Sequence, residues 1–483
     1  MKYGIIFLLG TMLSAEGSPV NAQTGYFVAN HKRVDIRQFD RQIEQMLDDV
    51  GSPGASIAII DNNKVVYTKG YGYKQASKKD RVDDSTVFEA CSISKTYVSY
   101  VALKLVEEGK LDLDKPVYQY LENPQLAHDQ RYKLITARML LSHCSGIENW
   151  IWDNDPKVLE MIATPGEKYT YSGAGITYLA NVLESILQKP YEQYVKEMIL
   201  DPLGLHNTFT TYKDGNIPSD YALGTLIDGK EVEKWKNKDP WPAAGVNVCA
   251  GDYARFLISV FDGTRLADKQ IRTILTKGFP VSSRSPQLYF GTGFPIAFAP
   301  NDTIINFTGS NIGFKVFIAY SIVHKTGFAV FSNYELGQYM SKRINGLTAG
   351  LDLDPVFQGS ITPQYPDPAY AILRIYRNKG KEAMFAEIER RRKEHNDKTL
   401  CHTIDELADM LYLEKPEVRQ KMLTENISCN PNDPTAYYLM GQAYKDQKQY
   451  AEAITYYLKS KNLKFNSGLC DDNISECERL KKM

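Results

Sequence analysis

The chain has 483 residues, which is too long for one ordinary domain and predicts two or three. Hydrophobic residues make up 43% of it, enough for a sizeable core, and 57 basic residues balance 58 acidic ones. Because this balance leaves no basic surface and the seven histidines are scattered, we expect no nucleic-acid partner, no metal and no cofactor.

Residues 1–22 have the pattern of a secretory signal peptide. Lys2 lies in a short basic start, an apolar run follows, and small residues at 20–22 form a cleavage site. The mature chain is then expected to begin near Gln23 and to be secreted across the inner membrane, into the periplasm or outside the cell. No later stretch is long and apolar enough to span a bilayer, so we expect no membrane span.

Residues 51–72 predict a β-hairpin. Apolar residues run through 55–60, a polar turn follows at 61–63, and a second apolar run begins at 65.

A serine and a lysine three residues apart stand at the start of the next predicted helix. Apolar residues recur downstream at helical spacing, which predicts one apolar face, and Gly109 ends the helix. Residues three apart share a helix face, so the Lys95 amine can reach the Ser92 hydroxyl. A serine hydroxyl needs such a base to lose its proton as it attacks a carbonyl. Ser92 is therefore a candidate nucleophile, and its backbone N–H is a candidate oxyanion donor.

Residues 88–116 extend this pattern. A β-like run precedes the serine, an apolar helix follows it, and Leu-Asp-Leu-Asp-Lys-Pro closes the segment. The whole segment resembles the nucleophile segment of the serine β-lactamase and penicillin-binding-protein superfamily, closest to the class C β-lactamase and D-alanyl carboxypeptidase/esterase branch. The resemblance covers residues 36–353. It implies an α/β (α+β) domain over residues 35–354 with the β-lactamase-like, transpeptidase-like fold, in which helices and a helical subdomain flank an antiparallel sheet.

Two other segments are similar to this family without an expected catalytic role. Residues 134–146 resemble the family helix that ends Leu-Leu-x-His-x-Ser-Gly, and we interpret His143 as a hydrogen-bonded structural residue at the helix end. Residues 243–256 are predicted to serve helix entry and packing.

The family's second motif, Tyr-x-Asn, is matched in part. Residues 165–175 contain a Pro-Gly turn and an aromatic run, and a helix is predicted over 178–187. The resemblance makes Tyr171 a candidate base. Gly173 stands where many relatives carry Asn, so an amide that would contact substrate is missing.

The family's third motif, Lys or His, then Ser or Thr, then Gly, has two candidate matches. Residues 325–327 match literally, but the family order requires a strand, a turn and a second strand before the last helix. Only the segment that begins at Phe307 leaves room for them. Thr308 and Gly309 are therefore the match, Ser310 offers a second oxyanion N–H from its main chain, and Phe307 replaces the usual cation.

The loss of that cation has two expected consequences. A cation there lowers the tyrosine pKa and holds a substrate carboxylate, and Phe307 does neither. Only Lys95 is left to lower the pKa of Tyr171 from about 10. We therefore expect a small-molecule or peptide substrate, an ester or amide without that carboxylate, to react through an acyl-serine. Either Lys95 or Tyr171 takes the first proton.

Two alternatives stay open at this point. One is a true β-lactamase or D-Ala-D-Ala carboxypeptidase whose carboxylate site uses other residues. The other is a catalytically inactive binding protein, which Gly173 and Phe307 both favour.

The C-terminal region reads as a separate module. Residues 355–368, rich in Pro, Gly, Gln and Ser, predict a linker, and residues 369–483 predict an all-α helical-repeat domain. Residues 437–457 resemble a tetratricopeptide repeat, with a degenerate one over 403–427. Because such units need neighbours, we expect stacking within the module or docking on the hydrolase domain. The module serves either a protein partner or a structural cap.

Overall fold

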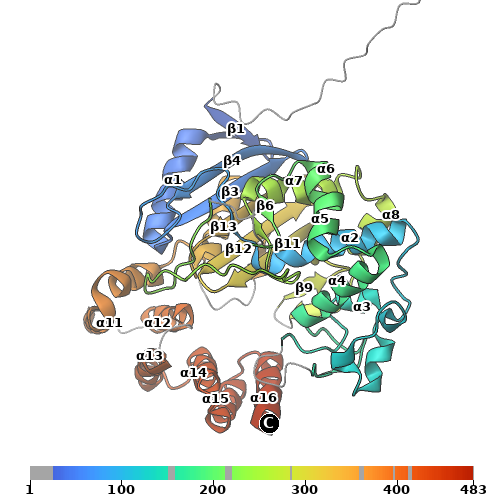
Figure 1. Ribbon diagram of the computed structural model, residues 1–483. Helices are drawn as coiled ribbons and strands as arrows, with labels where there is room; N and C mark the ends of the chain where they lie inside the picture. The colour runs from blue at the N-terminus through green and yellow to red at the C-terminus, as the bar shows by residue number, and fades with distance from the viewer. Residues whose placement is uncertain are drawn as a thin grey trace, which may run out of the picture.

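The computed structural model describes most of the chain. The described residues are 25–150, 158–212, 220–282, 285–357, 364–394, 398–411 and 416–481. The signal peptide predicted over residues 1–22 lies outside them. An α/β domain comes first, and a row of helices follows it (Figure 1).

An antiparallel sheet of eight strands forms the centre of the first domain, in the order β4-β3-β13-β12-β11-β10-β9-β8. The predicted hairpin over 51–72 is confirmed as β3 and β4. It pairs through β3 with β13, so the sheet joins the two ends of the domain. The strands are β3 Gly54–Asp61, β4 Lys64–Gly72, β8 Pro280–Ser282, β9 Ser285–Phe290, β10 Pro295–Ala299, β11 Asp302–Asn311, β12 Phe314–Ser321 and β13 Gly327–Ser332.

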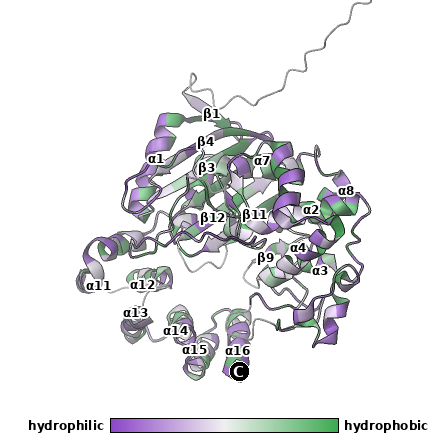
Figure 2. Cartoon of the chain, viewed as in Figure 1, coloured by the Kyte–Doolittle hydropathy of each residue, from purple (hydrophilic) through white to green (hydrophobic). Residues whose placement is uncertain are grey.

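Both faces of the sheet are covered. Side chains alternate along β3, so Ala58 and Ile60 join the core beneath helix α2, whereas Ile57 and Ile59 join the core beneath helix α1. Figure 2 shows apolar residues along the sheet and hydrophilic residues on the outer helices. The second core includes α1 Ile36–Val50, η6 Gly337–Met340 and α9 Ser341–Leu347, and a small sheet of β1 Tyr26–Ala29 and β2 Lys32–Asp35 lies beside α1.

The helical subdomain lies on the other face. Its central helix α2 is buried on all sides from Lys95 to Leu103, not on one face as expected, because α4 and α7 both pack against it. Tyr97, for example, stacks on Phe256 of α7 at 4.4 Å. The elements are β5 Phe88–Glu89, η1 Cys91–Ser94, α2 Lys95–Glu107, η2 Val117–Gln119, η3 Pro124–Leu126, η4 Gln130–Leu134, α3 Ala137–Leu141, α4 Gly173–Leu187, α5 Tyr191–Val195, η5 Lys196–Leu200, α6 Asp201–Leu203, β6 Thr208–Phe209, β7 Asn247–Val248, α7 Ala250–Phe261 and α8 Asp268–Ile274.

Helix α4 begins earlier than predicted. It starts at Gly173 instead of residue 178, because the Ser172 hydroxyl accepts the Gly175 N–H at 2.8 Å and caps the helix. This cap places Tyr171 immediately before a helix N-terminus.

The predicted linker over 355–368 is attached to the first domain where it is described. It starts within α10 Asp354–Phe357, where Phe357 stacks on Phe317 of the sheet at 5.4 Å. The Tyr365 hydroxyl then donates to Asp49 of α1 at 2.8 Å, and Arg374 pairs with the same carboxylate at 3.2 Å.

The C-terminal region is helical throughout its described residues. A single apolar core runs from the sheet face under α1 into these helices. The degenerate repeat predicted over 403–427 falls on a helix pair, α12 and α13. The helices are α11 Pro368–Glu394, which is kinked at Gly380, α12 Lys398–Met410, α13 Pro416–Cys429, α14 Pro434–Asp446, α15 Tyr450–Asn462 and α16 Ser467–Lys481. No helix in the described part of the chain has the length and apolar character needed to cross a membrane.

Close packing of α14 on α15 requires a glycine. A Cβ atom at Gly441 would lie 2.7 Å from the Tyr457 ring, whereas one at Gly346 of α9 would meet no atom within 4 Å. We predict that Gly441→Leu lowers the free energy of unfolding by about 2 kcal/mol, because it overpacks this contact. Gly346→Leu, the matched control, should stay within about 0.5 kcal/mol of the wild type in urea unfolding. Equal stabilities for the two variants would contradict the packing argument.

Candidate active site

Ser92 lies in η1, between the short strand β5 and helix α2. The Ala90 N–H donates to Val246 O at 2.8 Å, which joins β5 to β7 just before the turn. Cys91 follows with φ of 52°, a left-handed conformation that is costly for a residue with a side chain. Its buried thiol donates to Glu89 O at 3.3 Å. The packed turn therefore holds Ser92 at the beginning of α2.

Lys95 is buried against this serine. Its amine lies 3.3 Å from Ser92 Oγ and donates to the backbone oxygen of Ala243 at 2.8 Å. The side chain is 1% exposed, and this burial lowers the pKa of Lys95 to about 7. A large fraction of the amine is therefore unprotonated near neutral pH, with its lone pair beside Ser92. The Ala243 carbonyl is a contact that the sequence interpretation assigned only to packing.

Tyr171 completes the group of three. The Lys95 amine lies 4.8 Å from the centre of its ring, and the Ser92 side chain acts on the pKa of its hydroxyl. Burial raises the pKa of Tyr171, and the interaction with Ser92 offsets this only in part. The expectation that Lys95 lowers this pKa is therefore wrong, because desolvation outweighs every nearby charge. Tyr171 stays a protonated phenol at neutral pH.

His143 packs against the ring of Tyr171. Its Nδ1 accepts the Ser172 N–H at 3.1 Å, and its ring lies 4.3 Å from that of Tyr171. Burial holds the pKa of His143 well below its usual range, so the ring is neutral. This geometry agrees with its interpretation as a structural residue.

Strand β11 forms the opposite wall. A Cβ atom at Gly309 would lie 2.8 Å from Ala90 O and 3.3 Å from the Ser92 nitrogen, so only glycine lets the strand approach this closely. Thr308 and Ser310, on either side of it, are exposed. The literal motif at 325–327 lies in the turn after β12. Ser310 and Gly327 both pair with β12, but their partners on that strand are five residues apart, which separates the two by about 17 Å.

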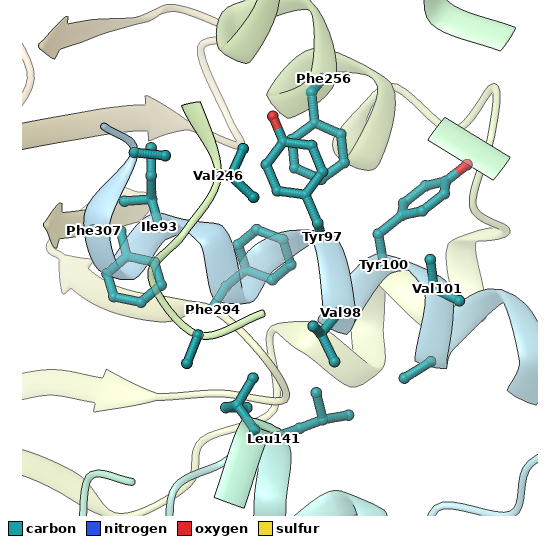
Figure 3. Close-up of a cluster of buried hydrophobic side chains, with 14 of the residues drawn as sticks. Ile93, Tyr97, Val98, Tyr100, Val101, Leu141, Val246, Phe256, Phe294 and Phe307 are labelled. Carbon is teal, nitrogen blue, oxygen red and sulfur yellow. The ribbon is translucent and has the colours of Figure 1, made fainter. Parts of the chain in front are cut away.

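Phe307 fills the expected cation position with a ring. Its side chain is 4% exposed and meets Phe290 edge-on at 5.7 Å, and Phe290 in turn meets His143 at 4.4 Å. Figure 3 shows Phe307 among the buried side chains that surround Ile93. The position therefore belongs to the core.

Gly173 lies under a tryptophan. A Cβ atom at this position would come within 2.0 Å of the Trp150 indole. The Gly173 N–H donates to Asn149 Oδ1 at 2.7 Å, and the Ala174 N–H donates to Asn149 O at 2.9 Å, which fixes the tryptophan over the start of α4. The indole thus fills the space that a side chain at position 173 would need. No spacing rule in the sequence connects positions 150 and 173.

These groups line one cleft of about 680 Å³. Ser92, Tyr171 and Ser310 open onto it. Half of its other lining residues are tryptophan or glutamate. The other lining residues are Glu89, Asn149, Trp150, Val232, Glu233, Trp235, Trp241, Ala244, Asn311, Ile312, Lys315 and Glu335.

Two lysines at the cleft are held by carboxylates. Lys234 pairs with Glu89 at 3.0 Å, and both side chains are buried. Lys315 pairs with Glu335 in a second buried contact. Asn311 donates to Glu89 at 2.7 Å, so the first pair also holds the end of β11 beside η1. Among the described residues, no cluster of three or more His, Cys, Asp or Glu side chains offers a metal site.

The contact between Gly173 and Trp150 can be tested by a double-mutant cycle. We predict that Gly173→Ala lowers stability by about 2 kcal/mol, because the new methyl group displaces the indole. Trp150→Gly removes the clash, so Gly173→Ala on that background should cost less than about 0.5 kcal/mol. Urea unfolding of the four proteins measures the coupling. Additive effects would show that the two residues do not meet.

Two family models match the chain. A model described as Beta-lactamase matches residues 39–346, and one described as Tetratricopeptide repeat matches residues 434–467.

Curated relatives match over different lengths. The chain is 30% identical over 209 residues to Protein flp of Staphylococcus aureus, a match that covers 40% of this chain and 42% of that protein. It is 24% identical over 339 residues to a beta-lactamase of Pseudomonas fluorescens, covering 62% of this chain and 94% of that protein. The match thus spans less than half the length of the staphylococcal relative.

Solved structures share the fold. A D-stereospecific amidohydrolase from Streptomyces sp. superposes with a TM-score of 0.57 at 21% identity, covering 66% of this chain and 99% of that one. The octameric penicillin-binding protein homologue from Pyrococcus abyssi gives a TM-score of 0.55 at 24% identity, covering 66% of this chain and 79% of that one.

Proposed function

This chain belongs to the beta-lactamase family, as a serine hydrolase, and we propose that it cleaves an ester or amide through an acyl-serine at Ser92. The observation that carries this proposal is the buried Lys95 amine, 3.3 Å from Ser92 Oγ with its pKa lowered to about 7. A base poised near the working pH beside a serine hydroxyl is the requirement for nucleophilic catalysis.

Acylation begins with Lys95 as the base. Ser92 Oγ bonds to the substrate carbonyl carbon while its proton moves to the Lys95 amine. The neutral amine has one lone pair and two N–H bonds, and one N–H is held by Ala243 O at 2.8 Å. This bond leaves the lone pair free to face the serine.

Tyr171 carries a proton to the leaving group. Its raised pKa keeps the phenol protonated, and it lines the same cleft as Ser92. As the bond between the carbonyl carbon and the leaving oxygen or nitrogen breaks, the phenol gives up its proton and regains one from Lys95. Water then attacks the carbonyl carbon of the acyl-serine while Lys95 takes a proton from it. The bond between that carbon and Ser92 Oγ breaks as the proton passes from Lys95 to Oγ, which releases the free acid and restores the serine.

The backbone N–H groups of Ser92 and Ser310 are the proposed oxyanion donors. Support comes from Gly309, where an added Cβ would lie 3.3 Å from the Ser92 nitrogen, and from the position of Ser310 on the cleft. Thr308 and Gly309 shape this wall, whereas Gly173 supplies no side-chain amide and Phe307 supplies no cation at the two motif positions.

The helical module is proposed as the site for a protein partner. Its support is the tetratricopeptide match over residues 434–467 and the packing of α14 against α15.

The acyl-serine predicts selective labelling. After treatment with a fluorophosphonate, the intact mass should increase by one adduct, and Ser92→Ala should remove it. Penicillin should give no adduct, because Phe307 offers no cation for its carboxylate.

Each of the other possible labelling results would favour one of the two alternative functions. A penicillin adduct that depends on Ser92 would favour a β-lactamase or a D-Ala-D-Ala carboxypeptidase. Adducts from neither reagent would favour a binding protein without catalysis.

The lysine base predicts the pH dependence. The unprotonated amine is active, so kcat/KM should rise with pH up to about 7 and fall about tenfold per unit below it. Lys95→Arg should abolish turnover, since a guanidinium stays protonated. Because the pKa of Tyr171 is raised, no falling limb is expected below pH 10. A tyrosinate base would instead give activity that rises only near or above pH 10.

A further inference from the structure

Three of the four tryptophans of the chain gather at the cleft that holds Ser92. The Trp150 and Trp241 rings lie 4.9 Å apart at 58°, and the Trp235 and Trp241 rings lie 4.6 Å apart at 89°. They come from two separate segments of the chain. Trp235 is 40% exposed, and Ile312 across the cleft is 66% exposed. Open apolar surface of this kind, inside a cleft, is typical of a ligand site.

The aromatic wall reaches the reacting groups. The Trp150 ring centre lies 5.7 Å from the Lys95 amine, and its indole covers Gly173 within contact distance. A substrate carbonyl at Ser92 therefore has an indole beside it.

The charges of the cleft disfavour an anion. Lys315 and Lys234 are each held in a buried pair, by Glu335 and Glu89 respectively. Glu233 also lines the cleft, and no cation of the described residues lies within ion-pair distance of it. A carboxylate bound beside Glu233 would meet a negative side chain, and both of these lysines already have carboxylate partners.

From this geometry we propose that Trp150, Trp235 and Trp241 bind an aromatic ring in the acyl part of the substrate, and that the substrate carries no carboxylate there. The inference rests on the proposed acyl-serine function and names its substrate class: esters or amides of uncharged or cationic arylalkanoic acids. The angled rings offer both an edge and a face to such a group.

The test compares p-nitrophenyl esters that share one leaving group and differ in the acyl group. We expect kcat/KM to be about tenfold higher for the phenylacetyl ester than for the acetyl ester, and lowest for the succinyl ester. Trp241→Ala should reduce the phenylacetyl-to-acetyl ratio about fivefold, and Trp241→Phe should keep it within about twofold. Glu233→Gln should raise the relative rate of the succinyl ester.

The control is Tyr376→Ala, which removes a ring from α11 in the helical module and should leave the ratio unchanged. A ratio that Trp241→Ala does not change, or a preference for the succinyl ester, would overturn the inference. Turnover that is lost in Ser92→Ala but shows no aromatic preference would overturn the inference alone. Turnover that persists in Ser92→Ala would refute the acyl-serine function itself.

Discussion

A single amine buried beside a serine is the constraint on which the rest of the structure depends. Lys95 is almost fully buried, and this burial lowers its pKa to about 7, while its amine donates to the backbone oxygen of Ala243. An exposed lysine in the same place would stay protonated and could not take a proton from Ser92. The packing around α2, the neutral ring of His143 and the phenol of Tyr171 all preserve this dry environment. Core packing and reactivity are therefore properties of the same side chains.

Outside the group of Ser92, Lys95 and Tyr171, the shape of the cleft depends more on the sizes of its side chains than on their charges. Gly309 lets β11 approach the nucleophile, and Gly173 lets an indole approach the start of α4. Phe307 extends the core into a position that could have held a cation, and the lysines nearby are held in buried pairs with carboxylates. The floor of the site is thus apolar and its rim is weakly acidic. Phe307 and the two buried ion pairs act in the same direction, since each leaves one group fewer to bind a substrate carboxylate.

Local patterns predicted the part of the site that depends on local geometry. The contact between Ser92 and Lys95 follows from helical spacing. The order of strands selected β11 over the literal match, and this assignment of the third motif stays a prediction. The fold class and the helical repeat are confirmed. The pKa of Tyr171 was predicted wrongly, and Trp150 was missed. Both depend on which distant segments meet, since desolvation and the space above a glycine are set by tertiary packing. The secretion signal stays a prediction.

The junction between the two domains affects where a protein bound to the helices would lie relative to Ser92. Tyr365 and Arg374 both bind Asp49 at the end of α1, and one apolar core continues from the sheet into α14 and α15. A flexible tether would let a captured protein sample many orientations around the enzyme. Helices attached by these contacts would instead hold a bound protein partner at one distance and angle from Ser92. In a large bound molecule, only the bonds whose distance from the bound region equals the distance from the helices to Ser92 would then come near the nucleophile. The helices would in this way select which bond is cleaved.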